Sequence, residues 1–321
     1  MKLRSRSIAI FAISGVIIYL FLTRSPHQPM FSQTTTPPPP QFKTVATEKI
    51  AIATNGDRAD VYYPNPPDLN SGDYSFPIAL FLQGYNVDKS YYSQFAQQVA
   101  RYGFVVIVPN HFATIRGGAQ LFARVQQIPQ SLAHLQAVRE RDVTSFSQII
   151  DPHKLVLLGH SHGGAVGLDA IRGACEVPFC VGEYAIPEAL VGAVFFGTFL
   201  LQDGDWVDNS GIPLALIAGD RDSIVPVRET RQTYEAIADP PKAYIEVMGA
   251  NHYGITNTDN PPGSPPEPNS PDIPQAIAIE TIARWTALFL RSTVLEDTAA
   301  IDYITGAGDL VDPHATAEIV L

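Results

Sequence analysis

Residues 155–163 read LVLLGHSHG, an apolar run that ends in the pattern Gly-x-Ser-x-Gly. A serine in this pattern, between a buried strand and a helix, is typical of a nucleophile elbow. The glycines are needed because the sharp strand-to-helix turn leaves no room for side chains beside the serine. Residues 164–168, GAVGL, open a helical pattern, and this context favours an elbow over an ordinary glycine-rich turn. The stretch therefore predicts that Ser161 is a nucleophile at the edge of a sheet.

Two further residues that can complete a catalytic triad follow Ser161 in the order acid, then histidine. The apolar run 214–218 reads as a buried strand, and two carboxylates follow it, Asp220 and Asp222. A carboxylate just beyond a strand end can reach an imidazole across the edge of the sheet. His252 follows the next predicted strand, where a general base is expected, and the alternative is an exposed loop histidine.

On these residues the chain resembles the serine hydrolases of the α/β-hydrolase superfamily. Three stretches show the resemblance, residues 76–109, 154–164 and 213–252, and the similarity covers roughly residues 47–295. Within the superfamily the chain is similar to the branch of dienelactone-hydrolase-like enzymes, platelet-activating-factor acetylhydrolases, chlorophyllases and cutinase-like polyesterases. The Gly-His-Ser-x-Gly-Gly form of the elbow resembles the chlorophyllase motif, in which x is usually Arg and here is His162. The third stretch looks most like the polyesterase and cutinase group.

The resemblance implies an α/β-hydrolase fold, in which a mostly parallel central sheet is flanked by helices on both faces. It favours Asp222 over Asp220, the alternative acid, because the Gly-x-x-Asp-x-x-Val-Pro pattern of the superfamily falls on residues 219–226. We expect the chemistry to need no cofactor and no metal. Asp220 and Asp222 have a calcium-like spacing, but the sequence lacks a full loop of oxygen ligands around them.

The resemblance also implies an oxyanion hole. Many relatives have His-Gly-x after the strand that corresponds to residues 78–82, and this chain has Gln83, Gly84 and Tyr85. In those relatives the amide after the glycine and the amide after the nucleophile donate to the oxyanion. We therefore expect the backbone N–H groups of Tyr85 and His162 to be the donors. Gln83, in place of the usual histidine, leaves both donors intact and changes what braces the loop.

Two loops and four side chains are expected around the substrate. Loops at the carboxyl ends of strands build the pocket in open α/β sheets, so the segments 112–129 and 258–274 are predicted to form its mouth. The alternative is that they are connections only. The candidate pocket residues are Gln83, Tyr85, His111 and Tyr253. His160, beside the nucleophile, reads as a packed residue of the elbow rather than a catalytic one.

The rest of the chain alternates between apolar strands and helical stretches. The segments 48–53 and 58–63 read as a hairpin. Further strands are expected near 78–82, 104–109, 155–159, 191–196, 214–219 and 243–248. Helices are expected near 91–101, 131–149, 163–172, 227–237 and 275–293.

Length and charge restrict the class of protein. The 321 residues suit one large domain with extensions, and we predict a catalytic domain over 47–295 and an acidic tail over 296–321. The net charge of −11 argues against a nucleic-acid partner, which favours basic patches. The sequence contains no dinucleotide-binding or P-loop pattern, and nothing in it indicates an obligate protein partner.

Residues 1–24 read as a targeting segment. Basic residues precede an uncharged stretch, residues 8–22, whose fifteen residues reach the upper limit for a signal peptide and fall just short of a spanning helix. We favour an uncleaved signal anchor, because no small-x-small cleavage site follows, and a cleaved signal peptide is the alternative. The charge bias predicts a catalytic domain on the exported side, in the periplasm, a lumen or the extracellular space. A Pro/Thr-rich linker, residues 25–46, would separate it from the membrane.

The two cysteines, Cys175 and Cys180, are close in sequence. An exported domain permits a disulfide between them, and two buried free thiols are the alternative. Two cysteines without a nearby histidine make a poor zinc site.

These features predict a serine carboxylic-ester hydrolase that acts on a hydrophobic ester through Ser161, His252 and Asp222. Chlorophyllase-like cleavage of a prenyl-type ester is the first choice, since a membrane tether would keep the enzyme near lipidic substrate. Cutinase-like or polyester hydrolysis and a lipid acetylhydrolase are the alternatives of the same class. An acyltransferase and a non-catalytic binding module are less favoured.

Overall fold

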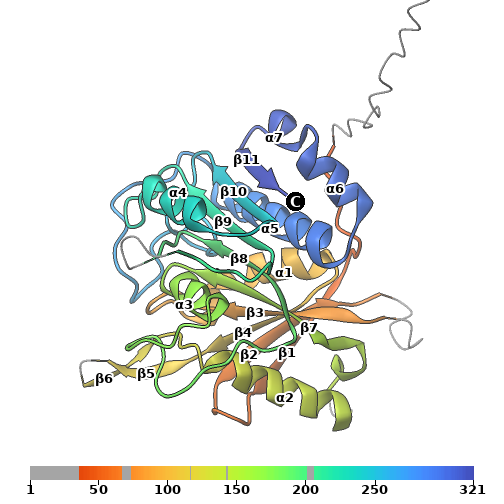
Figure 1. Cartoon of the computed structure of the whole chain (residues 1–321), viewed down its shortest axis with the longest axis vertical. Coiled ribbons are helices and arrows are strands. Elements are labelled where there is room, and N and C mark those ends of the chain that lie inside the picture. The colour runs from red at the N-terminus through yellow and green to blue at the C-terminus, as the bar shows by residue number, and fades with distance from the viewer. Residues whose placement is uncertain (1–35, 67–73, 116, 142–143, 201–205) are drawn as a thin grey trace, which may run out of the picture. The chain divides into compact units, whose positions relative to one another are not determined.

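The computed structural model describes residues 36–66, 74–115, 117–141, 144–200 and 206–321 (Figure 1). The predicted targeting segment, residues 1–24, lies outside the described residues, as does the first part of the predicted linker. Among the helices of the described ranges, none is both long enough and apolar enough to cross a membrane.

A mixed sheet of nine strands runs through the described residues, in the order β1-β2-β4-β3-β7-β8-β9-β10-β11. The six neighbouring strands from β4 to β10 are parallel to one another. The remaining pairs are antiparallel: β1 with β2, β2 with β4, and β11 with β10. The bounds are β1 (Val45–Ala51), β2 (Arg58–Pro64), β3 (Phe76–Leu82), β4 (Val105–Asn110), β7 (Ile150–His160), β8 (Leu190–Phe196), β9 (Leu214–Gly219), β10 (Lys242–Val247) and β11 (Ala315–Val320). The predicted mostly parallel sheet is confirmed.

Helices cover both faces of this sheet (Figure 1). One core contains the apolar side chains of α1, α5 and α6, and the other contains those of α2, α3 and α4. Alternate residues of one strand enter different cores: Ala79 and Phe81 of β3 enter the first, and Leu80 enters the second. The helices are η2 (Lys89–Tyr92), α1 (Ser93–Arg101), α2 (Gln127–Arg141), η3 (Ser147–Ile149), α3 (His162–Ile171), α4 (Val227–Ala236), α5 (Gln275–Val294), α6 (Thr298–Thr305) and α7 (Gly308–Val311).

The segment that we predicted as one loop over 112–129 has regular structure. Its first part forms the hairpin of β5 (Phe112–Ile115) and β6 (Gly118–Leu121), and α2 begins at Gln127. Gly117, in the turn, has a φ of 82°, which favours glycine. Strands of four residues are too short to give a clear alternating pattern, so the sequence did not indicate this hairpin.

Residues 296–321, predicted as a tail beyond the domain, contribute α6, α7 and β11 to the fold. Strand β11 pairs with β10 along the edge of the sheet. The buried Asp312 accepts hydrogen bonds from Arg284 Nη1 and Trp285 Nε1 of α5, both at 2.7 Å. These contacts fix the C-terminal segment to the longest helix of the described residues.

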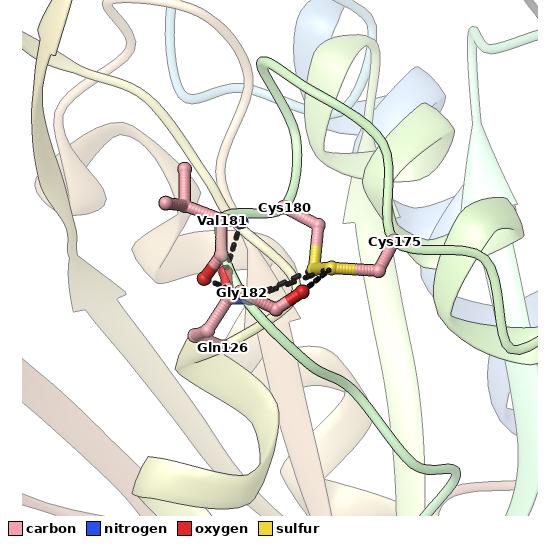
Figure 2. Close-up of a disulfide and its surroundings, with 5 residues drawn as sticks. All are labelled: Gln126, Cys175, Cys180, Val181 and Gly182. Carbon is pink, nitrogen blue, oxygen red and sulfur yellow. Dashed lines mark hydrogen bonds between the residues drawn. A yellow bond between two sulfur atoms is a disulfide. The ribbon is translucent and has the colours of Figure 1, made fainter.

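A disulfide joins Cys175 and Cys180 and closes the loop after α3, as predicted (Figure 2). The Gln126 side chain points toward the two sulfur atoms and donates to the Val181 carbonyl at 3.0 Å. The backbone N–H of Val125 donates to the Phe179 carbonyl at 2.9 Å, so the loop is attached to the residues before α2. Disulfides persist in oxidising compartments, which is the environment of exported proteins.

Candidate active site

Ser161 lies in a strained turn between β7 and α3. Its φ of 54° and ψ of −122° are unusual for a residue with a side chain. A Cβ atom added to Gly163 would lie 2.1 Å from the Leu82 carbonyl oxygen, and one added to Gly159 would lie 2.9 Å from the Phe195 ring. Both glycines are therefore required by close packing on either side of the serine. This is the sharp turn that the Gly-x-Ser-x-Gly pattern predicts.

Ser161, His252 and Asp222 form a continuous chain of hydrogen bonds. The distance from Ser161 Oγ to His252 Nε2 is 2.9 Å, and that from His252 Nδ1 to Asp222 Oδ2 is 2.7 Å. His252 and Asp222 are 2% and 6% exposed, whereas Ser161 is partly exposed, so the chain runs from the interior to a partly exposed serine. The three residues follow three different parallel strands, β7, β9 and β10, at their carboxyl ends.

The hydrogen-bond partners show where the protons of this chain lie. A carboxylate only accepts, so His252 Nδ1–H donates a hydrogen bond to Asp222. The lone pair of Nε2 then faces Ser161 and accepts a hydrogen bond from its hydroxyl. The other oxygen of Asp222 accepts from the Val225 amide at 2.7 Å, which keeps the carboxylate in place. The arrangement can remove a proton from the serine hydroxyl as the oxygen attacks an electrophile.

Asp220, the alternative acid, faces a different group. Its Oδ1 accepts a hydrogen bond from the Gly249 amide. This contact joins the turn after β9 to the turn after β10. The structure therefore brings Asp222 to His252 and leaves Asp220 on the backbone, where it braces the two turns.

The two predicted oxyanion donors lie on the two segments that meet at the elbow. His162 is the first residue of α3, so its N–H has no acceptor within the helix, and the positive end of the helix dipole lies beside it. Tyr85 follows β3, whose last carbonyl packs against Gly163. Among the described residues neither amide donates a hydrogen bond to another backbone group, and their role as oxyanion donors stays a prediction.

The comparison with known families agrees with this geometry. Residues 66–177 match the family model of chlorophyllase, a family of the α/β-hydrolase superfamily. The protein has the α/β-hydrolase fold. The matched stretch includes Tyr85, Ser161 and His162, and it ends before Asp222 and His252. No curated protein matches the chain.

Two of the four candidate pocket residues are buried. Gln83 is fully buried, and its Nε2 donates to the His111 carbonyl at 2.8 Å. Tyr253 is 1% exposed, and its hydroxyl donates to the Pro265 carbonyl. Both side chains therefore brace loops beside the site instead of facing an open space.

The other two candidate pocket residues, Tyr85 and His111, are partly exposed. The Tyr85 hydroxyl donates to Gln120 of the β5–β6 hairpin. His111 Nδ1 lies 2.9 Å from Asp57 Oδ2. A role in substrate binding stays a prediction for these two residues.

The two segments predicted to form the mouth contact the residues around Ser161. In the first, the Ala123 carbonyl accepts from His162 Nε2 at 3.0 Å, and the ring of Phe122 lies 3.9 Å from that of His162. Burial lowers the pKa of His162 to about 4, so its ring is neutral at pH 7 and serves as a packed donor. In the second, Glu267 accepts from the Ser223 amide at 2.9 Å, next to Asp222.

Glu267 was not predicted from the sequence. It is 4% exposed in a Pro-rich loop, and it accepts from the backbone of Ser223, Ile224 and Asn269. A carboxylate in such a loop ordinarily reads as a solvated residue, and the contact that gives it a role spans 44 positions of the chain. No local pattern could have indicated it.

Proposed function

We propose that the protein is a serine carboxylic-ester hydrolase that forms an acyl-enzyme on Ser161. The observation that supports this most is the unbroken chain from Asp222 through His252 to the partly exposed serine, at 2.7 and 2.9 Å. The match to the chlorophyllase family supports hydrolase chemistry on independent grounds.

In the first half-reaction, His252 Nε2 takes the proton of Ser161 while Oγ attacks the ester carbonyl carbon. The carbonyl π electrons move to the oxygen, and the resulting anion accepts hydrogen bonds from the Tyr85 and His162 amides. Asp222 stabilises the imidazolium and keeps its orientation. The tetrahedral intermediate then breaks its bond to the alkoxide, which takes the proton from His252 and leaves as the alcohol.

In the second half-reaction, water replaces the alcohol. His252 accepts a proton from the water as its oxygen attacks the acyl carbon, and the same two amides bind the second oxyanion. Collapse of this intermediate breaks the bond to Ser161 Oγ, which recovers its proton from His252. The products are a carboxylic acid and the free enzyme, and each step uses only groups of the chain and water.

For the substrate we propose a hydrophobic ester with a prenyl-type alcohol, of the kind that chlorophyllases cleave. The family match over residues 66–177 supports this choice. A polyester or cutin-like substrate is the second candidate. Residues 213–252, which contain Asp222 and His252, lie outside the matched stretch and resemble the cutinase group. A lipid acetylhydrolase is third.

We further propose that the enzyme works on the exported side of a membrane, attached through residues 1–24. The disulfide supports an oxidising compartment. A tether would raise the local concentration of enzyme at lipidic substrate, which favours a hydrophobic ester over a soluble one.

The test is a substrate panel with the full chain in detergent. A short nitrophenyl ester, chlorophyll, a phospholipid acetyl ester and a polyester film are compared, with Ser161→Ala as the control. Selective release of the prenyl alcohol from chlorophyll supports the first choice. Turnover of only the short ester or the film moves the assignment to a cutinase-like enzyme. Absence of any turnover, together with no labelling of Ser161 by a fluorophosphonate, overturns the proposed function.

A further inference from the structure

Two fully buried polar side chains, Tyr92 and His160, lie between the loop after β3 and the loop of His252. Tyr92 ends η2, and His160 is the last residue of β7, directly before Ser161. Both are 0% exposed, and neither takes part in the proposed reaction. The large majority of polar side chains buried so completely in proteins have hydrogen-bond partners.

Their hydrogen bonds form one chain across the base of the site. The distance from the Gly84 amide nitrogen to Tyr92 Oη is 2.9 Å, and that from Tyr92 Oη to His160 Nδ1 is 3.0 Å. His160 Nε2 lies 2.9 Å from the His252 carbonyl oxygen. Gly84 precedes the proposed oxyanion donor Tyr85, so the chain joins the oxyanion loop to the backbone of the general base.

The direction of each hydrogen bond follows from its last member. A carbonyl oxygen only accepts, so His160 Nε2 carries the proton and donates it to His252 O. Burial, together with the neighbouring His252, lowers the pKa of His160 well below its usual value, so the ring is neutral. Its Nδ1 therefore accepts a hydrogen bond from the Tyr92 hydroxyl, and the oxygen of that hydroxyl accepts one from the Gly84 N–H. Both ring nitrogens of His160 and the Tyr92 hydroxyl thus have hydrogen-bond partners.

The chain also explains the glycine of the oxyanion loop. A Cβ atom added to Gly84 would lie 2.8 Å from His160 Nδ1 and 3.1 Å from Tyr92 Oη. Any larger residue would push the loop away from the pair. The packing is close on the other side too, because the His160 and His252 rings are 4.8 Å apart.

We propose that Tyr92 and His160 are positioning residues, which fix the distance between the oxyanion loop at Gly84 and the His252 backbone on either side of Ser161. This rests on the proposed function, because it assigns a purpose to the spacing of an oxyanion donor and a general base. Transition-state stabilisation depends on such spacing more steeply than substrate binding does. Loss of the chain therefore lowers kcat and leaves KM nearly unchanged.

The first experiment compares Tyr92→Phe with the matched control Tyr303→Phe in the full-length protein. Both remove one hydroxyl from a fully buried tyrosine, and the Tyr303 hydroxyl donates to Gly308 O at 3.3 Å, outside the site. With a short nitrophenyl ester, Y92F is expected to lose about tenfold to a hundredfold in kcat with KM changed less than about twofold. Y303F is expected to match the wild type. Equal kcat in the two variants overturns the proposal.

The second experiment tests the link to His252. Glutamine at position 160 can still donate to the His252 carbonyl, whereas leucine cannot, so H160Q is expected to keep more of the wild-type kcat than H160L. Equal loss in both overturns the link. A ¹⁵N spectrum of His160 supplies a readout that does not depend on turnover. We expect a protonated Nε2 and an accepting Nδ1 in the wild type, with the Nδ1 resonance shifted in Y92F, and a proton on Nδ1 overturns the proposed direction.

The outcomes separate this proposal from the proposed function. A wild-type protein that hydrolyses no ester and is not labelled at Ser161 overturns the function. A wild-type protein that hydrolyses esters while Y92F is as active as Y303F overturns the positioning role alone.

Discussion

The Glu267 carboxylate accepts a hydrogen bond from the Ser223 amide at 2.9 Å, directly after Asp222 in the chain. The Ser223 hydroxyl donates to the same carboxylate. The turn that presents Asp222 to His252 is thus supported from outside by a loop that follows the histidine. The Glu267 side chain thus connects the turn of Asp222 to the loop that follows His252.

We therefore expect Glu267→Gln to weaken this turn. An amide has one acceptor oxygen where the carboxylate has two, so some donors of the turn lose their partner, at a cost of about 1–3 kcal/mol of folding free energy. Thermal unfolding measures the loss, with Glu188→Gln, an exposed position, as the control. Equal melting temperatures for E267Q and E188Q would contradict the role of Glu267.

The same carboxylate gives the stability a pH dependence. Burial alone would raise the pKa of Glu267, but the hydrogen bonds from Ser223 and the neighbouring backbone outweigh burial and lower it. A pKa lowered by folding contributes stability above the unfolded value of about 4.3, which is lost as the pH falls through the folded value. Melting curves between pH 6 and pH 3 are expected to converge for the wild type and E267Q. A constant difference across this range would exclude Glu267 as a cause.

The two aspartates after β9 are expected to differ in their effect on turnover. Asp222→Asn removes the acceptor that fixes the His252 tautomer, and by analogy with measured triads it costs roughly 10⁴-fold in kcat. Asp220→Asn disturbs only the bond to the Gly249 amide, so its effect is expected to be far smaller. Kinetics with the short nitrophenyl ester test this, with Ser161→Ala as the inactive reference. The reverse order would assign the acid to Asp220.

Asp312 is expected to be essential for stability but not for chemistry. Asp312 is buried beside Arg284 and Trp285. Burial alone would raise the pKa of its carboxyl, but the hydrogen bonds from Arg284 outweigh this effect and lower the pKa. Asp312→Asn removes one of the two carboxylates that pair with Arg284, while Glu280 remains at 2.8 Å, and it weakens the hydrogen bonds from Arg284 and Trp285. We expect a loss of about 1–3 kcal/mol in unfolding free energy. Denaturant unfolding gives the value, with the exposed Glu296→Gln as the control. An unchanged midpoint would contradict a structural role of residues 296–321.

The disulfide is expected to contribute modestly, because it closes a loop with a sequence separation of 5. Chain entropy predicts about 2 kcal/mol for so short a loop. The double variant Cys175→Ser/Cys180→Ser and the reduced wild type are expected to melt at the same lower temperature. A reducing agent is then expected to leave the melting temperature of the double variant unchanged. A further decrease would show that the agent acts on something other than this disulfide.

Local patterns in the sequence predicted the central part of the fold well. The apolar runs of the parallel strands and the glycines beside Ser161 report directly on burial and close packing, and both are local features. The prediction was less accurate where the structure depends on distant partners. Strand β11 has a weak pattern of small and polar residues, and it becomes a strand because β10 offers an open edge. Helix α2 begins at Gln127, four residues before the predicted start at 131, since the segment before it is attached to the disulfide loop.

The candidate site was predictable to a similar extent. The chain order of Ser161, Asp222 and His252 is a sequence property, and the structure places the serine and the aspartate each within hydrogen-bonding distance of the histidine. The bracing groups were not predictable. Glu267 contacts a turn 44 positions away, and Tyr92 contacts His160, 68 positions away, and no motif marks such contacts.

The backbone of Ser161, at a φ of 54°, favours glycine over serine at this position. Glycine adopts this conformation without strain, so a glycine at 161 would stabilise the protein by about 1 kcal/mol or more. A lineage that used this protein only as a binding module would gain stability from that exchange. Selection for the hydroxyl is the force that opposes it. The elbow thus gives up stability at one position for the sake of a reactive oxygen.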